Sequence, residues 1–252
     1  MKYWKKPTPD QVDRAIALLG RRMHRRYFFD RLRNPEWIKP LFNKKFFLDP
    51  PDIEKDEEKG TIGFPLWPES RYLARMANLE PELVLKIILD MPETENIRVY
   101  EDFADAALAM PPQVSAKLIK KAKIWAQSPY QHFLAKKLGD LMTKLANAGM
   151  IEEALDLAKT VLVLIPDPRR KKEEKEDEQI SLSPEPISRV DKWDYETILK
   201  ENIPDLITSS GVRTFDFLCD LLEQYIELSQ RKGKADAPND YSWIWRPAIE
   251  DH

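Results

Sequence analysis

Apolar residues recur at helical spacing near the start of the chain. Thr8 suits the N-cap and Pro9 the first helical position, so the sequence predicts one long helix from Thr8 to Arg33. Its apolar residues return every three or four positions and predict one buried face: Val12, Ile16, Leu19, Met23 and Tyr27. Pro35 follows directly and opens a second, short helix. We therefore expect residues 1–48 to form a basic N-terminal helix and a short helix.

Between residues 65 and 166, helical patterns follow one another at short intervals, each opened by a proline or a polar cap. The connections are short, so consecutive helices should pair as antiparallel hairpins. The intervals from Pro81 to Pro112 and from Pro112 to Met150 fall in the range of about 30–40 residues typical of helical repeats. Each hairpin can bury its apolar face only by stacking on its neighbours. The sequence thus predicts an all-α fold, an irregular right-handed solenoid of antiparallel helical hairpins, with the basic helix packed at its N-terminal end.

Two stretches are predicted as loops because they are highly charged and lack an apolar period. The first covers residues 49–64. The second covers residues 167–191, contains three prolines and is expected to be a mobile charged loop. Residues 192–252 should then form C-terminal helices, near 194–201, at 204–209 and from 212 to 230.

The longest of these C-terminal helices should be covered on both sides. Its apolar stripe contains Phe215, Leu218, Cys219, Leu222, Tyr225 and Ile226, widened by Phe217, Leu221 and Leu228. The chain then ends in YSWIWRPAIEDH, without the polar helix that normally closes a solenoid. We therefore expect more chain to follow, as in one region of a larger multidomain protein.

One hairpin resembles a tetratricopeptide repeat over about 34 residues starting at Ala135. The residues that carry the resemblance are Leu138, Leu141, Leu145, Gly149, Ala154 and Pro166. Three residues depart from the family pattern: Met142, Ala158 and Val161. Looser packing than in the family consensus is expected there.

The resemblance implies that the first helix of this hairpin lines a groove for an extended peptide. The implied groove residues are Lys136, Gly139, Thr143, Ala146 and Asn147. The family's carboxylate-binding variant has asparagine where this chain has Thr143 and a basic residue where it has Gly139. Recognition of a peptide carboxyl terminus is therefore not expected.

The preceding hairpins resemble HEAT-like repeats instead. The run DMPETENIRVYEDFADAAL resembles a turn followed by a second helix, with Arg98 and Asp102 as an i, i+4 pair. Two other stretches, FFDRLRNPEWIKPLFNKKFFLDPP and TIGFPLWPESRYLARMA, resemble N-terminal helical regions of large prokaryotic proteins, some associated with phage defence.

Charge is distributed unevenly. Residues 1–47 hold thirteen Lys or Arg against four Asp or Glu, a net +9, so the rest must carry −12 within the total of −3. Arg14, Arg21, Arg22 and Arg25 would lie opposite the apolar stripe of the predicted helix, and aromatic residues lie between the charges. Such a mixture can contact phosphates and stack on bases, which makes nucleic-acid binding the alternative function. We favour the interpretation in which the arginines are solvated on the outer face of the helix and the aromatic residues pack inside. Docking onto an acidic surface, including the chain's own acidic repeats, is a third interpretation.

Motifs for catalysis are missing from the sequence. There is no phosphate-binding glycine loop, nucleophile elbow, zinc-binding histidine helix or calcium loop, so we expect no enzyme, metal or cofactor. Tyr130 and His132 are interpreted as structural, and Cys219 as a buried small apolar residue. A single cysteine and the lack of a long apolar run favour a cytoplasmic protein without a membrane partner. We therefore expect a non-catalytic scaffold that binds a protein or another domain of the same chain.

Overall fold

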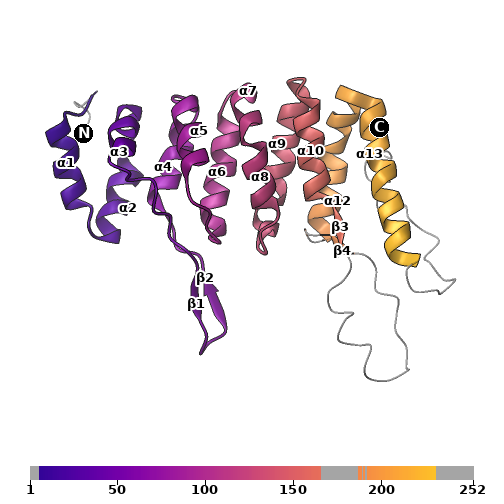
Figure 1. Cartoon of the computed structure of the whole chain (residues 1–252), viewed down its shortest axis with the longest axis horizontal. Helices are drawn as coiled ribbons and strands as arrows, with labels where there is room; N and C mark the ends of the chain where they lie inside the picture. Colours follow the sequence, from indigo (N-terminus) through magenta and orange to yellow (C-terminus); the bar gives the residue numbers. More distant parts are fainter. Residues whose placement is uncertain (1–5, 166–186, 189, 191, 231–252) are drawn as a thin grey trace. The chain divides into compact units, whose positions relative to one another are not determined.

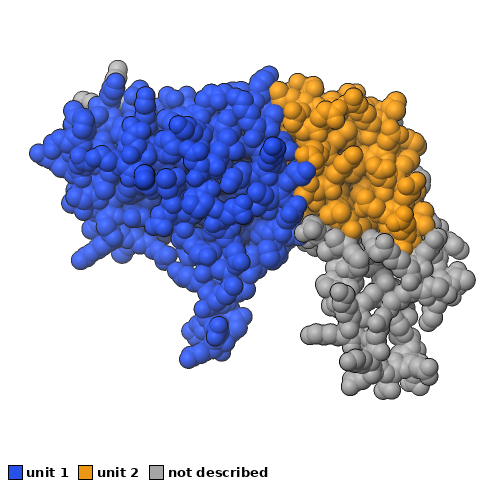
Figure 2. All heavy atoms as spheres, viewed as in Figure 1, with its two compact units in different colours: residues 1–137 blue, residues 138–252 orange. Residues whose placement is uncertain are grey.

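The computed structural model describes residues 6–165, 187–188, 190 and 192–230. These residues are mostly helical, which confirms the all-α class. The chain divides into two compact units, residues 1–137 and 138–252 (Figure 2), and each is described by itself.

Unit 1 is a succession of helices (Figure 1), joined by short links except between α3 and α4, where residues 44–67 intervene. Its helices are α1 (Pro9–Leu18), α2 (Arg22–Arg31), η1 (Pro35–Trp37), α3 (Ile38–Asn43), α4 (Pro68–Met76), α5 (Pro81–Asp90), α6 (Ile97–Ala109), α7 (Pro112–Ser115), η2 (Ala116–Leu118), α8 (Ile119–Ala126) and η3 (Gln131–Phe133), and α9 (Ala135–Asn147) begins in it. Proline occupies the first position of α1, α4, α5 and α7, where its missing N–H is not needed. Helix α4 packs mainly against α6 on one side and α2 on the other.

The single helix expected from Thr8 to Arg33 is wrong. It consists of two helices, because α1 ends at Leu18 and α2 begins only at Arg22. Gly20 lies in the link, and glycine inside a helix costs about 1 kcal/mol relative to alanine. Arg21 is extended, with φ −105° and ψ 142°, so the chain changes direction there.

This break also divides the expected apolar stripe. Val12 and Leu19 are buried, as predicted, but Met23 is 82% exposed and Tyr27 is 59% exposed. The residues that α2 buries are Phe28 and Phe29 instead. Phe29 lies among other aromatic rings, with its centroid 5.5 Å from that of Tyr72 and 6.3 Å from that of Phe47.

The stretch 49–64, expected to be a loop, contains a short antiparallel hairpin. Its strands are β1 (Glu54–Asp56) and β2 (Thr61–Gly63), and Figure 1 shows the hairpin extending away from the helices. Gly60 adopts a φ of +61° in the turn. The Asp56 carboxylate accepts a hydrogen bond from the Lys59 backbone amide, which closes the turn.

Unit 2 contains most of α9, then α10 (Ile151–Val161), β3 (Leu164–Ile165), β4 (Ile187–Ser188), α12 (Lys192–Glu201) and α13 (Ile203–Gln230). The two C-terminal helices expected at 204–209 and 212–230 are the two parts of α13, which bends at Ser210. Strands β3 and β4 pair antiparallel, so 187–188 belong to a strand and not to the expected loop. The remainder of that loop except Val190, and residues 231–252, lie outside the described residues.

The stripe expected along the last helix is present only in part. Leu218 and Tyr225 are buried and Cys219 is half-buried. Phe215, however, is 62% exposed, so its predicted burial is wrong. Leu228 lies among the residues whose side chains are not described.

Candidate interaction surface at the N-terminal hairpin

Helices α1 and α2 together form the N-terminal hairpin. An apolar depression lies on this hairpin. Its volume is about 720 Å³. Leu18 and Tyr27 line it although they are 71% and 59% exposed, and the buried Phe28 and Trp37 contribute to its floor. Monomeric proteins rarely leave a large contiguous apolar patch in water, so such a depression indicates a place where another apolar surface packs.

Polar residues at the rim fix the ends of α1. Thr8 and Gln11 form a reciprocal capping box, in which the Gln11 backbone N–H donates to Thr8 Oγ1 over 3.3 Å. His24 Nδ1 lies 2.9 Å from the carbonyl oxygen of Leu18, at the other end of the helix. The rim is thus held in place by contacts of its own, and the apolar floor lies between two ordered ends.

The four arginines of the expected basic surface do not share one helical face, because the helix that would have aligned them is broken. Arg14 lies 3.1 Å from Asp10, and Arg22 lies 3.2 Å from Glu54 on the hairpin β1–β2. Arg21 is exposed and precedes α2 as its N-cap residue. Ion pairs between exposed groups contribute only about 0–1 kcal/mol, so Arg14 and Arg22 can exchange partners readily.

Arg25 differs from the other three because it is only partly exposed and has several contacts. Its Nε donates to the Leu19 carbonyl over 3.0 Å, which ties α2 to the end of α1. Its guanidinium carbon lies 5.0 Å from the centre of the Phe46 ring, within the range of a cation–π contact. Arg25 therefore has a structural role in the hairpin, in contrast with the solvated role expected for it.

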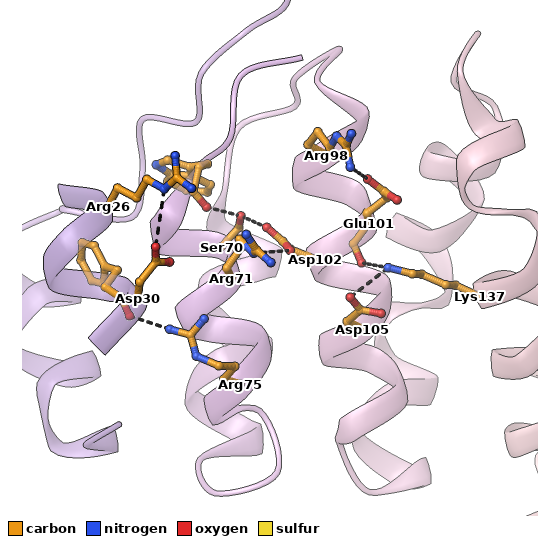
Figure 3. Close-up of polar contacts among 12 residues, drawn as sticks. Arg26, Asp30, Ser70, Arg71, Arg75, Arg98, Glu101, Asp102, Asp105 and Lys137 are labelled. Carbon is orange, nitrogen blue, oxygen red and sulfur yellow. Dashed lines mark hydrogen bonds and ion pairs between the residues drawn. The ribbon is translucent and has the colours of Figure 1, made fainter. Parts of the chain in front are cut away.

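A second polar arrangement lies along α2, α4, α6 and the start of α9 (Figure 3). Two of its ion pairs lie within one helix, Arg26–Asp30 at 3.6 Å in α2 and Arg98–Glu101 at 3.3 Å in α6. The other two join different helices, Arg71–Asp102 at 4.0 Å and Lys137–Asp105 at 2.9 Å. Ser70 also donates to Asp102, which joins α4 to α6. The expected Arg98–Asp102 pair is therefore wrong: Arg98 pairs with Glu101, and Asp102 turns toward α4.

Asp102 is the most perturbed carboxylate of this arrangement. Burial raises the pKa of Asp102 to about 6, while the Ser70 hydrogen bond and the Arg71 charge act in the opposite direction. These contacts fix α4 against α6. These contacts stabilise the packing of unit 1 and do not themselves form a binding site.

The implied groove on α9 is partly occupied by the chain itself. Thr143 accepts a hydrogen bond of 3.0 Å from Nδ2 of Asn202, the residue between α12 and α13. A Cβ at Gly139 would lie only 2.3 Å from Oδ1 of the same asparagine. Lys136 and Asn147 remain at the surface, while Ala146 is buried. Asn202 was not predicted from the sequence; the signal that points to it is Gly139, since a glycine inside a helix indicates a close approach.

Among the residues that the structure describes, no group of three or more His, Cys, Asp and Glu side chains could hold a metal ion. None of the described helices has both the length and the apolar character that crossing a membrane requires.

Comparison with protein-family models, curated proteins and solved structures finds no match to this chain.

Proposed function

We propose that this chain is a non-catalytic scaffold for protein–protein or interdomain interaction, and that it is one region of a larger protein. In this proposal its helices stack as hairpins of a right-handed solenoid similar to tetratricopeptide and HEAT repeats. The N-terminal hairpin then forms an end of the stack, where an apolar surface is left for a partner.

The repeat assignment is supported by the residues around the turn between α9 and α10. Gly149 has a φ of +78°, a conformation that glycine adopts without strain. Ala154 is fully buried, as a small residue must be where two helices approach closely. Leu141 is also fully buried, in agreement with its position in the family pattern.

The observation that carries the interaction proposal is the apolar depression on the N-terminal hairpin. An amphipathic helix fits such a surface, because it places apolar residues on one side at every third or fourth position. The surroundings are basic: residues 6–47 contain eleven Lys or Arg and four Asp or Glu. Complementary charge favours an acidic helix over a basic one. We therefore propose an acidic amphipathic helix, from a partner protein or another domain, as the occupant.

The test is a selection of binders from a library of displayed helical peptides against the full chain. We expect the selected peptides to carry acidic residues and apolar residues at i, i+3 or i+4 and i+7, with Kd values of about 1–100 μM. Leu18→Glu should weaken binding at least tenfold, because it places a charge in the depression. The matched control is Leu79→Glu, since Leu79 is also exposed, at 55%, but does not line the depression. Equal binding by both variants, or no selected peptide, contradicts the proposal.

Nucleic-acid binding is the alternative function, and a binding assay with the full chain can distinguish it from the scaffold. Exposed charges are largely screened beyond about 10 Å at 0.1 M salt. At that salt concentration we therefore expect the chain not to bind duplex or single-stranded nucleic acid with micromolar affinity. The variant for this test replaces Arg14, Arg21 and Arg22 with glutamine and keeps Arg25, which holds the hairpin together. Micromolar binding that this variant loses, with a steep salt dependence, would replace the scaffold by the nucleic-acid alternative.

A further inference from the structure

Helix α13 carries a second apolar face beside the one that it buries. The buried face of the part after the bend contains Phe217, Leu218, Leu221 and Tyr225. Five further apolar residues recur at alternating intervals of three and four, which we call the α13 stripe: Val212, Phe215, Cys219, Leu222 and Ile226. Val212 is 77% exposed and Phe215 is 62% exposed, while the other three are half-buried. This spacing is typical of a helix that packs against another helical element.

The α13 stripe is a continuous surface and not a single exposed side chain. From Val212 to Ile226 it extends along about 21 Å of helix, at a rise of 1.5 Å per residue. Scattered apolar residues are normal on a protein surface, whereas a contiguous apolar patch indicates an interaction site. The stripe thus has the pattern of a helix face that docks into an apolar depression.

Acidic residues border the α13 stripe on the side away from the buried face. At about 100° per residue, four exposed acidic residues share that side of the helix: Asp216, Asp220, Glu223 and Glu227. Arg213 is the only basic residue between positions 212 and 227, so four negative charges against one positive charge give a net charge of −3. This part of α13 is therefore an acidic amphipathic helix.

The depression on the N-terminal hairpin has the complementary properties. Leu18 and Tyr27 provide exposed apolar side chains there, and Arg14, which pairs with Asp10, also lines it. The guanidinium carbon of Arg31 lies 4.4 Å from the centre of the Tyr27 ring, so a further cation lies beside the depression. One chain thus carries both an apolar depression with basic surroundings and an acidic helix with an exposed apolar stripe.

We propose that α13 of one copy of this chain docks by its stripe into the depression on the N-terminal hairpin of a second copy. The proposal rests on the proposed function, in which the depression takes an acidic amphipathic helix, and it names the source of that helix. The contact is heterologous, because it joins two different surfaces of the chain.

Charge favours this contact over the simpler pairing of two α13 helices. Two stripes that meet would bring together helices that each have a net charge of −3, and like charges across an interface disfavour association. At the N-terminal hairpin, the same acidic side chains approach Arg14 and Arg31 instead, which favours association.

The contact should be weak, because a single helix face forms it. Such a contact falls at the small end of the range of about 1,200–2,000 Å² that stable interfaces bury. We therefore expect a Kd of about 10–100 μM, so that the chain is a monomer at about 1 μM.

The test measures the mass of the full chain by sedimentation equilibrium between about 1 and 300 μM. Leu18→Glu places a charge in the depression and keeps the α13 stripe, whereas Phe215→Glu places a charge in the stripe and keeps the depression. Both residues are more than half exposed, so circular dichroism should show the same helix content as in wild type. We expect wild type to associate and each variant alone to associate about tenfold more weakly or less.

Mixing the two variants gives the decisive result. Each variant supplies the surface that the other lacks, so the mixture should form a 1:1 complex although each variant alone is a monomer. The matched control is Leu79→Glu, because Leu79 is 55% exposed and lies in neither surface. This control should associate as wild type does.

Charge reversal on α13 separates docking at the basic hairpin from general apolar association. Asp220→Lys combined with Glu223→Lys changes two exposed acidic residues and leaves the α13 stripe intact. Docking onto the N-terminal hairpin should weaken about tenfold, because two attractive charges become repulsive. Pairing of two α13 helices should instead become stronger, because their mutual repulsion is relieved.

The other results overturn the proposal. A chain that stays a monomer up to about 300 μM lacks the contact. Association that only one of the two glutamate variants abolishes indicates that one surface pairs with itself. Two variants that stay monomeric when mixed show that the depression and the stripe do not meet. If selected helical peptides still bind in a manner that depends on Leu18, the depression takes a helix from elsewhere, so this proposal fails and the proposed function stands.

Discussion

The N-terminal hairpin and the pair α4–α6 belong to the same unit and show the same helical spacing of apolar residues, yet they bury them very differently. In α4, Tyr72 and Leu73 are fully buried. In the N-terminal hairpin, Leu18 and Met23 are more than two-thirds exposed. The difference follows from neighbours: α4 packs against α2 and α6, whereas α1 packs against α3. Periodicity indicates that a helix has an apolar face, but only the arrangement of other elements decides whether that face is covered.

A similar difference exists between the polar residues on two sides of α4. On the side of α6, Ser70 and Asp102 bind each other. On the side of α2, Glu69 has only the long pair with Arg25. The first arrangement is satisfied by the chain and fixes the packing. The second leaves a fully buried carboxyl group with one long ion pair, so this side of α4 is less well satisfied by the chain.

Truncating a leucine in each region should give the largest contrast. Leu73→Ala leaves a cavity in the core and should lower the free energy of unfolding by about 2–5 kcal/mol. Leu18→Ala removes a side chain that is 71% exposed and should change it by less than about 0.5 kcal/mol. Urea unfolding followed by circular dichroism measures both. Comparable losses would mean that the N-terminal hairpin is covered in solution, for example by a second copy of the chain.

The second prediction concerns pH and the two carboxyl groups of α4 and α6. Burial raises the pKa of Glu69 from 4.5 to about 7 and that of Asp102 from 3.8 to about 6. Because both folded-state pKa values are raised, the folded protein holds these protons more tightly than the unfolded chain. Stability from this source is present below about pH 4 and is lost as pH rises through 6 to 7.

For Glu69 alone the loss should be about 3 kcal/mol between pH 4 and pH 8. Glu69→Gln should remove that part of the dependence, and the Asp102 part between pH 4 and 6 should remain. Unfolding free energies of the two proteins across this range provide the measurement. Parallel profiles for wild type and Glu69→Gln would show that Glu69 is not buried in the folded chain.

Most helices could be predicted from the sequence because local signals mark where they begin. Proline at positions 81 and 112 opens helices in the structure, and the two parts of α13 were both expected. The break at Gly20 was missed because one glycine costs only about 1 kcal/mol, less than tertiary packing contributes. Burying Phe28 and Phe29 against residues far along the chain decides the direction of α2, and no window around Gly20 contains that information.

The polar contacts of the candidate sites were much less predictable. Spacing suggested the pair Arg98–Asp102, but the partner of Asp102 is Ser70, thirty-two residues away. Glu69 follows Pro68 in the first turn of a helix, where an acidic residue is common because it interacts favourably with the helix N-terminus. Such residues are normally exposed. Its burial depends on the packing of other helices against α4, among them α2, which meet it only in the folded unit.

The smallest predicted effect sharpens the comparison between the two sides of α4. Ser70→Ala removes the hydroxyl that binds Asp102 and should destabilise the chain by about 1–2 kcal/mol at pH 7.5, where Asp102 is mostly ionised. Arg71→Gln should change stability by less than about 0.5 kcal/mol, because its pair with Asp102 is 4.0 Å long and Arg71 is half exposed. A double-mutant cycle with Asp102→Asn isolates the Ser70–Asp102 coupling from other effects of each substitution. A coupling free energy near zero would mean that Asp102, on the α6 side of α4, is no better stabilised by a partner than Glu69 on the α2 side. The contrast with Glu69 would then lose its basis, since both carboxyl groups would be buried without a stabilising partner.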